Sequence, residues 1–137
     1  MLEMSGIQAA SLYLAIQMIL VIVLAYRVVQ VRSKDSISLG DGEDLGMQRR
    51  IRIHANLIEY APMFFLGLFA LAATSAPVVL IHGFGAVFTF ARCGHAFNFN
   101  NKVENSGVPK GRFFGTLFTW LSTMALALTL LFYVLTG

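Results

Sequence analysis

Four apolar stretches alternate with polar segments along this chain of 137 residues. The stretches cover about residues 7–31, 51–74, 77–99 and 112–136. A helix needs about 20 predominantly apolar residues to cross a bilayer, so each stretch is long enough to span one. Polar, turn-rich segments at 33–50 and 100–111 follow the first and third stretches. This pattern predicts an all-α integral membrane protein, a single domain folded as an up-down bundle of four transmembrane helices.

The composition supports a membrane protein and narrows its partners. Hydrophobic residues make up 57% of the chain and charged residues 12%, whereas soluble domains carry about 25% charged residues. The single cysteine, Cys93, excludes an intrachain disulfide and a cysteine-rich metal site. The three histidines lack the spacing of metal ligands, so we expect no metal. Basic residues lie at the edges of the apolar stretches and form no run interleaved with aromatics, so we expect no nucleic-acid partner.

The distribution of lysine and arginine predicts the topology. Apart from Arg92, all of these residues lie in or beside the two long polar segments. The opposite ends of the apolar stretches carry neither lysine nor arginine. Because positively charged loops stay in the cytosol, we expect both long loops to be cytosolic and both termini to lie on the other side of the membrane.

The second apolar stretch carries a polar stripe in the sequence RIHANLIEYAP, residues 52–62. Arg52, Asn56 and Glu59 are spaced i, i+4 and i+7, which places them on one face of a helix. Glu59 lies roughly 10 Å along the helix from Arg52, at about 1.5 Å per residue. Inserting a carboxylate at that depth costs on the order of 3 kcal/mol, so we expect a compensating partner.

The third and fourth stretches supply further polar residues. Arg92, His95 and Phe99 are spaced i, i+3 and i+7, again on one face. Counted back from Phe99, Arg92 is about 10 Å deep, which is the depth of Glu59 counted from Arg52. We therefore predict that Arg92 and Glu59 lie close together, within one subunit or across an interface. Arg112 opens the fourth stretch near the cytosolic interface.

Together these residues predict a cationic layer with one buried carboxylate in the cytosolic third of the bundle. The layer comprises Arg52, His54, Asn56, Glu59, Arg92, His95 and Arg112. It suits a small ligand with two carboxylates and an amine, held beside a lipid-accessible surface. The structural alternatives are an ion pair or oligomer contact for Glu59 and Arg92, a helix–helix hydrogen bond for Asn56, and interfacial snorkelling for the other arginines.

Several other polar or aromatic residues have simpler interpretations. His54 is expected to act indirectly or at the interface, and His82 lies near the far end of the third stretch, where it is expected to pack. Cys93 is expected to be a small core residue. Trp120 and the phenylalanines are most simply explained by contacts with lipid or within the bundle.

Three motifs resemble the signatures of one family, the membrane-associated proteins in eicosanoid and glutathione metabolism (MAPEG). Arg52-x-x-x-Asn56-x-x-Glu59-Tyr60-x-Pro62 resembles the family's second-helix signature. Ala91-Arg92-x-x-His95 resembles the third-helix signature, and Pro109-x-x-Arg112 resembles the start of the fourth helix. The resemblance covers the chain from about Arg27 to its end. The variant RIHANLIEYAP is most similar to the small bacterial, microsomal-glutathione-transferase-like branch.

The resemblance implies a homotrimer that binds glutathione, as a cosubstrate, between neighbouring subunits near the cytosolic side. Arg112 stands where the family's arginine stabilises the glutathione thiolate, which makes Arg112 the expected catalytic residue. The residues expected to bind glutathione are Arg27, Arg52, Asn56, Glu59, Tyr60, Arg92 and His95. Phe99 departs from the pattern, because eicosanoid-making relatives carry a ligand-binding tyrosine there, so one hydroxyl contact is absent.

The function implied by the resemblance is that of an enzyme, a glutathione transferase or peroxidase in a bacterial inner membrane. It would join the glutathione thiolate to a lipophilic electrophile or reduce a lipid hydroperoxide, with membrane lipids as neighbours. One alternative is a non-catalytic lipid-binding member of the same fold. Another is a small four-span multidrug transporter, although the arginines around Glu59 would repel cationic drugs.

Overall fold

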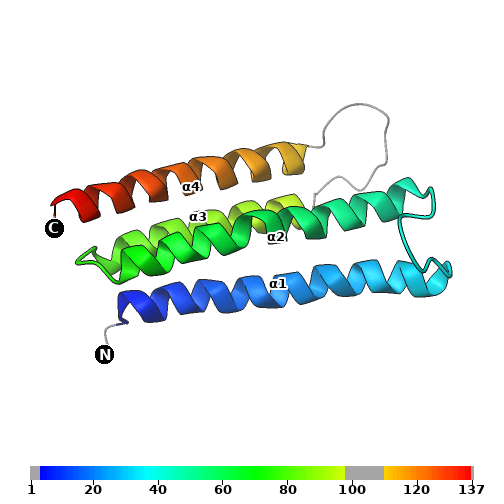
Figure 1. The fold of residues 1–137 in the computed structure, drawn as a ribbon, viewed down its shortest axis with the longest axis horizontal. Coiled ribbons are helices and arrows are strands. Elements are labelled where there is room, and N and C mark those ends of the chain that lie inside the picture. The colour runs from blue at the N-terminus through cyan, green and yellow to red at the C-terminus, as the bar shows by residue number, and fades with distance from the viewer. Residues whose placement is uncertain (1–3, 98–109, 137) are drawn as a thin grey trace.

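In the part of the chain that it describes, residues 4–97 and 110–136, the computed structural model contains four α-helices and no strand (Figure 1). The helices are α1 (Gly6–Lys34), α2 (Leu45–Ala72), α3 (Val78–Phe97) and α4 (Lys110–Thr136). Each is long and apolar enough to cross a membrane. The predicted class, an all-α membrane bundle of four helices, is therefore confirmed.

Helix α2 begins earlier than its apolar stretch. It starts at Leu45 instead of about residue 51, so part of the expected polar loop is helical. Asp44 caps this end, because its backbone is extended and its carboxylate accepts the Met47 N–H at 2.7 Å. Met47 is fully buried, which ties the added turn to the bundle. The hydrophobicity pattern missed this turn because residues 48–50 are polar, although glutamine and arginine favour helix.

The helices α2 and α3 form the centre of the bundle, and α1 and α4 lie on opposite sides of them (Figure 1). Within the described residues, α1 and α4 each pack on both central helices and not on each other. The start of α1 and the end of α4 lie at one end of the bundle, and the α1–α2 connection lies at the other end. We call this second end the loop end, since the last turn of α3 and the first turn of α4 also point toward it.

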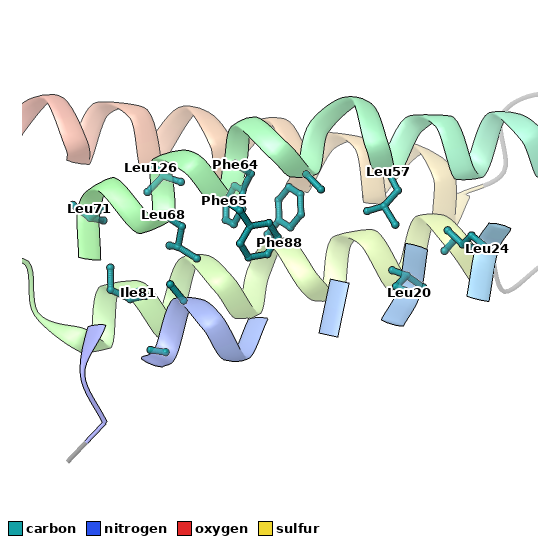
Figure 2. Packing of buried hydrophobic residues seen from close by; sticks show 14 of the residues in the cluster. Leu20, Leu24, Leu57, Phe64, Phe65, Leu68, Leu71, Ile81, Phe88 and Leu126 are labelled. Carbon is teal, nitrogen blue, oxygen red and sulfur yellow. The ribbon is translucent and has the colours of Figure 1, made fainter. Parts of the chain in front are cut away.

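An aromatic cluster joins the two central helices. Phe64 of α2 stacks on Phe88 of α3 with ring centroids 3.8 Å apart, and Phe65 meets both rings edge-on. Figure 2 shows these rings between aliphatic side chains such as Leu68 and Leu57. Because lipid tails are as apolar as these side chains, the cluster stabilises the bundle through close packing more than through hydrophobic transfer.

Two glycines allow close approach between helices. A Cβ atom at Gly85 of α3 would collide with the ring of Tyr13 on α1. A Cβ atom at Gly115 of α4 would lie 2.7 Å from the Cβ of His95 and 2.8 Å from the carbonyl oxygen of Ala91 on α3. Both distances are shorter than carbon atoms tolerate, so Gly115 is what lets the start of α4 lie directly against the end of α3.

Gly115→Ala is expected to lower the free energy of unfolding by about 1–3 kcal/mol, the usual effect of overpacking. The added methyl group would meet the α3 backbone, which does not move aside as a flexible side chain does. Gly83→Ala is the matched control, since a Cβ atom at Gly83 meets nothing within 4 Å. The control is expected to stabilise the helix slightly, by up to about 1 kcal/mol. Chemical denaturation in detergent, followed by circular dichroism, measures both, and equal effects would contradict the packing argument.

Candidate functional site

A buried arginine connects three helices near the loop end. Arg92 of α3 is only 1% exposed. Its guanidinium donates one hydrogen bond to Asn56 Oδ1 of α2 at 2.7 Å and another to Thr119 Oγ1 of α4 at 3.2 Å. The Thr119 hydroxyl in turn donates to the carbonyl oxygen of Gly115 at 2.7 Å. Arg92 therefore cross-links α2, α3 and α4 in the layer where the sequence predicted the polar residues.

The predicted pairing of Arg92 with Glu59 is wrong within one chain. Glu59 pairs instead with Arg52 on its own helix, with Oε1 and Nη1 3.4 Å apart, and both side chains are about half exposed. The reason is helical geometry. Three residues turn the helix by about 300°, so Glu59 points about 60° away from Asn56, which faces Arg92. The version of the prediction that places the pair across a subunit interface stays a prediction.

A pocket of about 260 Å³ lies beside this cross-link. Helix α2 contributes Asn56, α3 contributes His95, and α4 contributes most of the wall. The lining residues are Asn56, His95, Arg112, Phe113, Thr116, Leu117 and Trp120. Three residues that the sequence singled out, Asn56, His95 and Arg112, thus meet in one cavity although they come from three helices. We call this cavity the polar pocket.

The polar pocket combines positive charge with unused hydrogen-bonding capacity. Its described lining contains Arg112, which is half-buried, and no acidic residue. His95 is 3% exposed, and its Nδ1 has no partner among the described residues. Such a pocket is suited to an anion that brings its own hydrogen-bonding groups.

Tyr60 and Trp120 form a second link between α2 and α4. The indole Nε1 of Trp120 donates to the Tyr60 hydroxyl oxygen at 2.9 Å, and the indole also lines the polar pocket. The sequence pattern predicts only a packing role for Trp120 and gives Thr116 no role. The signal was present, because Arg112, Thr116 and Trp120 are spaced i, i+4 and i+8 and share one face of a helix.

The remaining predicted site residues lie outside the polar pocket of a single chain. Arg52 and Glu59 form their exposed pair on α2 and do not line the pocket. Arg27 is half-buried on α1, which does not pack on α4 in the described parts of the chain.

His82 lies far from the pocket, as expected, and its Nδ1 is hydrogen-bonded to the Tyr13 hydroxyl at 3.1 Å. Phe99 and Pro109 fall outside the described residues.

Thr119→Val tests the cross-link made by Arg92. The change leaves one buried guanidinium N–H without an acceptor, so the free energy of unfolding is expected to fall by about 1–3 kcal/mol. Thr123→Val is the control, because the only hydrogen bond found for the Thr123 side chain in the described chain goes to the carbonyl oxygen of Thr119 on its own helix. Denaturation of both variants in detergent measures the difference. A Thr119 variant as stable as the control would show that the hydrogen bond contributes little.

Comparison with known proteins agrees with the motifs. The chain is similar to two proteins named "Inner membrane protein YecN", from Escherichia coli strain K12 and from Escherichia coli O6:H1 strain CFT073. Each is 26% identical over 125 residues, which cover 91% of this chain and 92% of the relative. No solved structure matches the chain. The sequence profile described as the MAPEG family matches residues 10–132, nearly the whole bundle. This four-helix membrane protein therefore belongs to the MAPEG family, the membrane-associated proteins in eicosanoid and glutathione metabolism.

Proposed function

We propose that the chain is a glutathione-dependent enzyme that joins the glutathione thiolate to lipophilic electrophiles or uses it to reduce lipid hydroperoxides. One observation carries this proposal. A buried arginine, which has no carboxylate partner among the described residues, holds Asn56 beside a pocket that also contains Arg112 and His95. Membership of a family linked to glutathione supports glutathione as the anionic ligand.

Arg112 is proposed as the catalytic residue. A free thiol has a pKa near 8.5, and the thiolate is the nucleophile. A guanidinium beside the sulfur in a partly dry pocket favours the charged form and so raises the thiolate fraction at neutral pH. In conjugation, the sulfur forms a bond to the electrophilic carbon and the leaving group departs with the bonding electrons. In peroxide reduction, the sulfur attacks the terminal peroxide oxygen, which releases the lipid alcohol, and a second glutathione yields the disulfide and water.

The other proposed binding residues divide into two groups. Asn56, His95, Tyr60 and Arg92 belong to the polar pocket or its immediate support, and Arg92 acts by holding Asn56. Arg27, Arg52 and Glu59 lie outside the pocket of their own chain. In a homotrimer with the site between subunits, this second group would serve a neighbouring pocket. Arg52 would hold a glutathione carboxylate, and Glu59 would accept the ammonium.

The proposed location is a bacterial inner membrane with both long loops in the cytosol. The relatives from Escherichia coli are named as inner membrane proteins. The basic residues gather at the loop end, where Arg32 and Lys34 end α1 and Lys110 begins α4. Under the positive-inside rule this end faces the cytosol, where a water-soluble thiol is supplied.

Trp120 makes the binding proposal directly testable, because it is the only tryptophan in the chain and it lines the polar pocket. Titration with glutathione in detergent or nanodiscs is expected to change its fluorescence saturably. Asn56→Leu and Arg112→Ala are each expected to weaken binding about tenfold or more, the effect of losing a charge-assisted hydrogen bond. Lys34→Ala, on the exposed end of α1, is the matched control and should bind normally. No saturable change at millimolar glutathione would leave the fold standing and refute glutathione as the ligand.

A second experiment separates catalysis from binding. Arg112→Ala is expected to raise the pKa of the bound glutathione thiol by about one unit or more, so that the thiolate fraction at pH 7 falls about tenfold. Thiolate absorbance in the ultraviolet measures this pKa, and the rate of conjugation to a lipophilic aryl halide should fall in proportion. Arg112→Lys keeps a positive charge and should retain part of the rate. An unchanged thiol pKa in Arg112→Ala would remove Arg112 from the catalytic role.

A further inference from the structure

The outer face of α3 and α4 is hollowed toward the loop end. A groove of about 410 Å³ lies there between the two helices, and we call it the α3–α4 groove. None of its lining residues has a polar side chain. Phe90, Phe114 and Phe118 are 77%, 49% and 48% exposed, so the groove opens to the surroundings of the bundle. The full lining is Val87, Phe90, Ala91, Gly94, Gly111, Phe114, Gly115 and Phe118.

Glycines keep the floor of the α3–α4 groove open. Gly115 is needed for the contact between the two helices, because a Cβ atom there would meet the α3 backbone. Gly94 has no such reason, since a Cβ atom at its position meets nothing within 4 Å among the described residues. A glycine inside a helix is destabilising relative to alanine. Packing within one chain therefore does not account for Gly94, whereas an occupant of the groove that lies against the α3 backbone does.

The α3–α4 groove faces away from the polar pocket. Phe114 follows Arg112 by two residues, and at about 100° per residue it points roughly 160° away from Arg112 around α4. In the proposed homotrimer the neighbouring subunits meet on the side of the polar pocket, which leaves the groove facing lipid. The part of α4 from Gly111 to Phe118 covers about 10 Å, so the groove fits within one leaflet, whose hydrocarbon is about 15 Å thick.

We propose that the α3–α4 groove binds one acyl chain of an anionic phospholipid, with the lipid phosphate held beside Lys110. The apolar lining suits a hydrocarbon chain. Lys110 is exposed and directly precedes Gly111, which lines the groove at its loop end. The first turn of α4 contains no acidic residue, and the positive end of the helix dipole lies there as well. Basic residues at the cytosolic edge of a membrane helix attract anionic headgroups. The groove shares no lining residue with the polar pocket, so this inference goes beyond the proposed function.

Two lipids with the same acyl chains and different headgroups test the proposal. Native mass spectrometry of the detergent-purified protein measures how much of it keeps an added lipid. Phosphatidylglycerol is expected to bind about fivefold more tightly than phosphatidylcholine, the factor that one basic residue near an anionic headgroup contributes. Lys110→Gln should abolish this preference. Lys34→Gln is the matched control, because Lys34 is also exposed at the loop end but lies on α1, and this variant should keep the preference.

A second pair of variants tests the part of the site that holds the acyl chain. Gly94→Leu fills the floor of the groove, and its Cβ atom meets no neighbouring helix, so both lipids are expected to bind severalfold more weakly. Gly83→Leu is the matched control, because a Cβ atom there also meets nothing within 4 Å and Gly83 lines a separate hollow further from the loop end. This control should bind both lipids as the wild type does. Melting curves confirm that each variant is folded.

Four results would overturn the proposal. The wild-type protein could bind the two lipids equally, the preference could survive in Lys110→Gln, or folded Gly94→Leu could bind both lipids normally. The fourth result is a second copy of the chain in the groove. Cys93 is the only native cysteine, so Phe118→Cys in a Cys93→Ser background carries a single thiol at the groove. Efficient disulfide cross-linking between copies, with no lipid retained, would identify the second copy as the occupant. Glutathione binding in the polar pocket is measured separately and does not depend on any of these results.

Discussion

The buried guanidinium of Arg92 is the constraint on which the loop end of the bundle depends. A charged group 1% exposed inside a membrane helix is costly unless its N–H groups find acceptors. Asn56 and Thr119 accept from its two terminal nitrogens and come from two other helices, so these two bonds fix the relative positions of α2, α3 and α4. The buried Nε has no partner among the described residues. The same bonds orient the Asn56 side chain at the rim of the polar pocket. Stability and site geometry therefore rest on one interaction.

Close packing makes that interaction possible. Gly115 removes the side chain that would separate α4 from α3, which brings Thr119 within reach of Arg92 and Arg112 close to His95. The stacked rings of Phe64 and Phe88 hold the central helices together further along the bundle. Because apolar transfer contributes little between helices in lipid, such contacts of shape and hydrogen bonding determine the arrangement.

The central position of α2 and α3 gives the bundle two different sides. On the α4 side, a cationic pocket collects Asn56, His95 and Arg112. On the α1 side, an apolar groove lies between α1 and α2, with the buried Gln17 among its lining residues. The pair formed by Arg52 and Glu59 belongs to neither and is about half exposed on a membrane helix. Under the proposed function, the first side binds a water-soluble thiol and the exposed pair meets a neighbouring subunit.

The long apolar runs by themselves determined the four membrane-spanning helices, because a span needs about 20 apolar residues and the chain contains four such runs. The i, i+4 and i+3 spacings placed Asn56 on one helix face and Arg92 and His95 on another, and Arg112 was placed by its position at the start of the fourth stretch. The structure brings Asn56, His95 and Arg112 of the predicted layer into one pocket. Only the tertiary structure decided the partners of these residues. Asn56 and Glu59 point about 60° apart around α2, and the sequence does not show which of them faces Arg92. The roles of Trp120, Thr119 and Gln17 also depended on the neighbouring helices, because a polar or aromatic residue in an apolar run does not reveal which helix it faces.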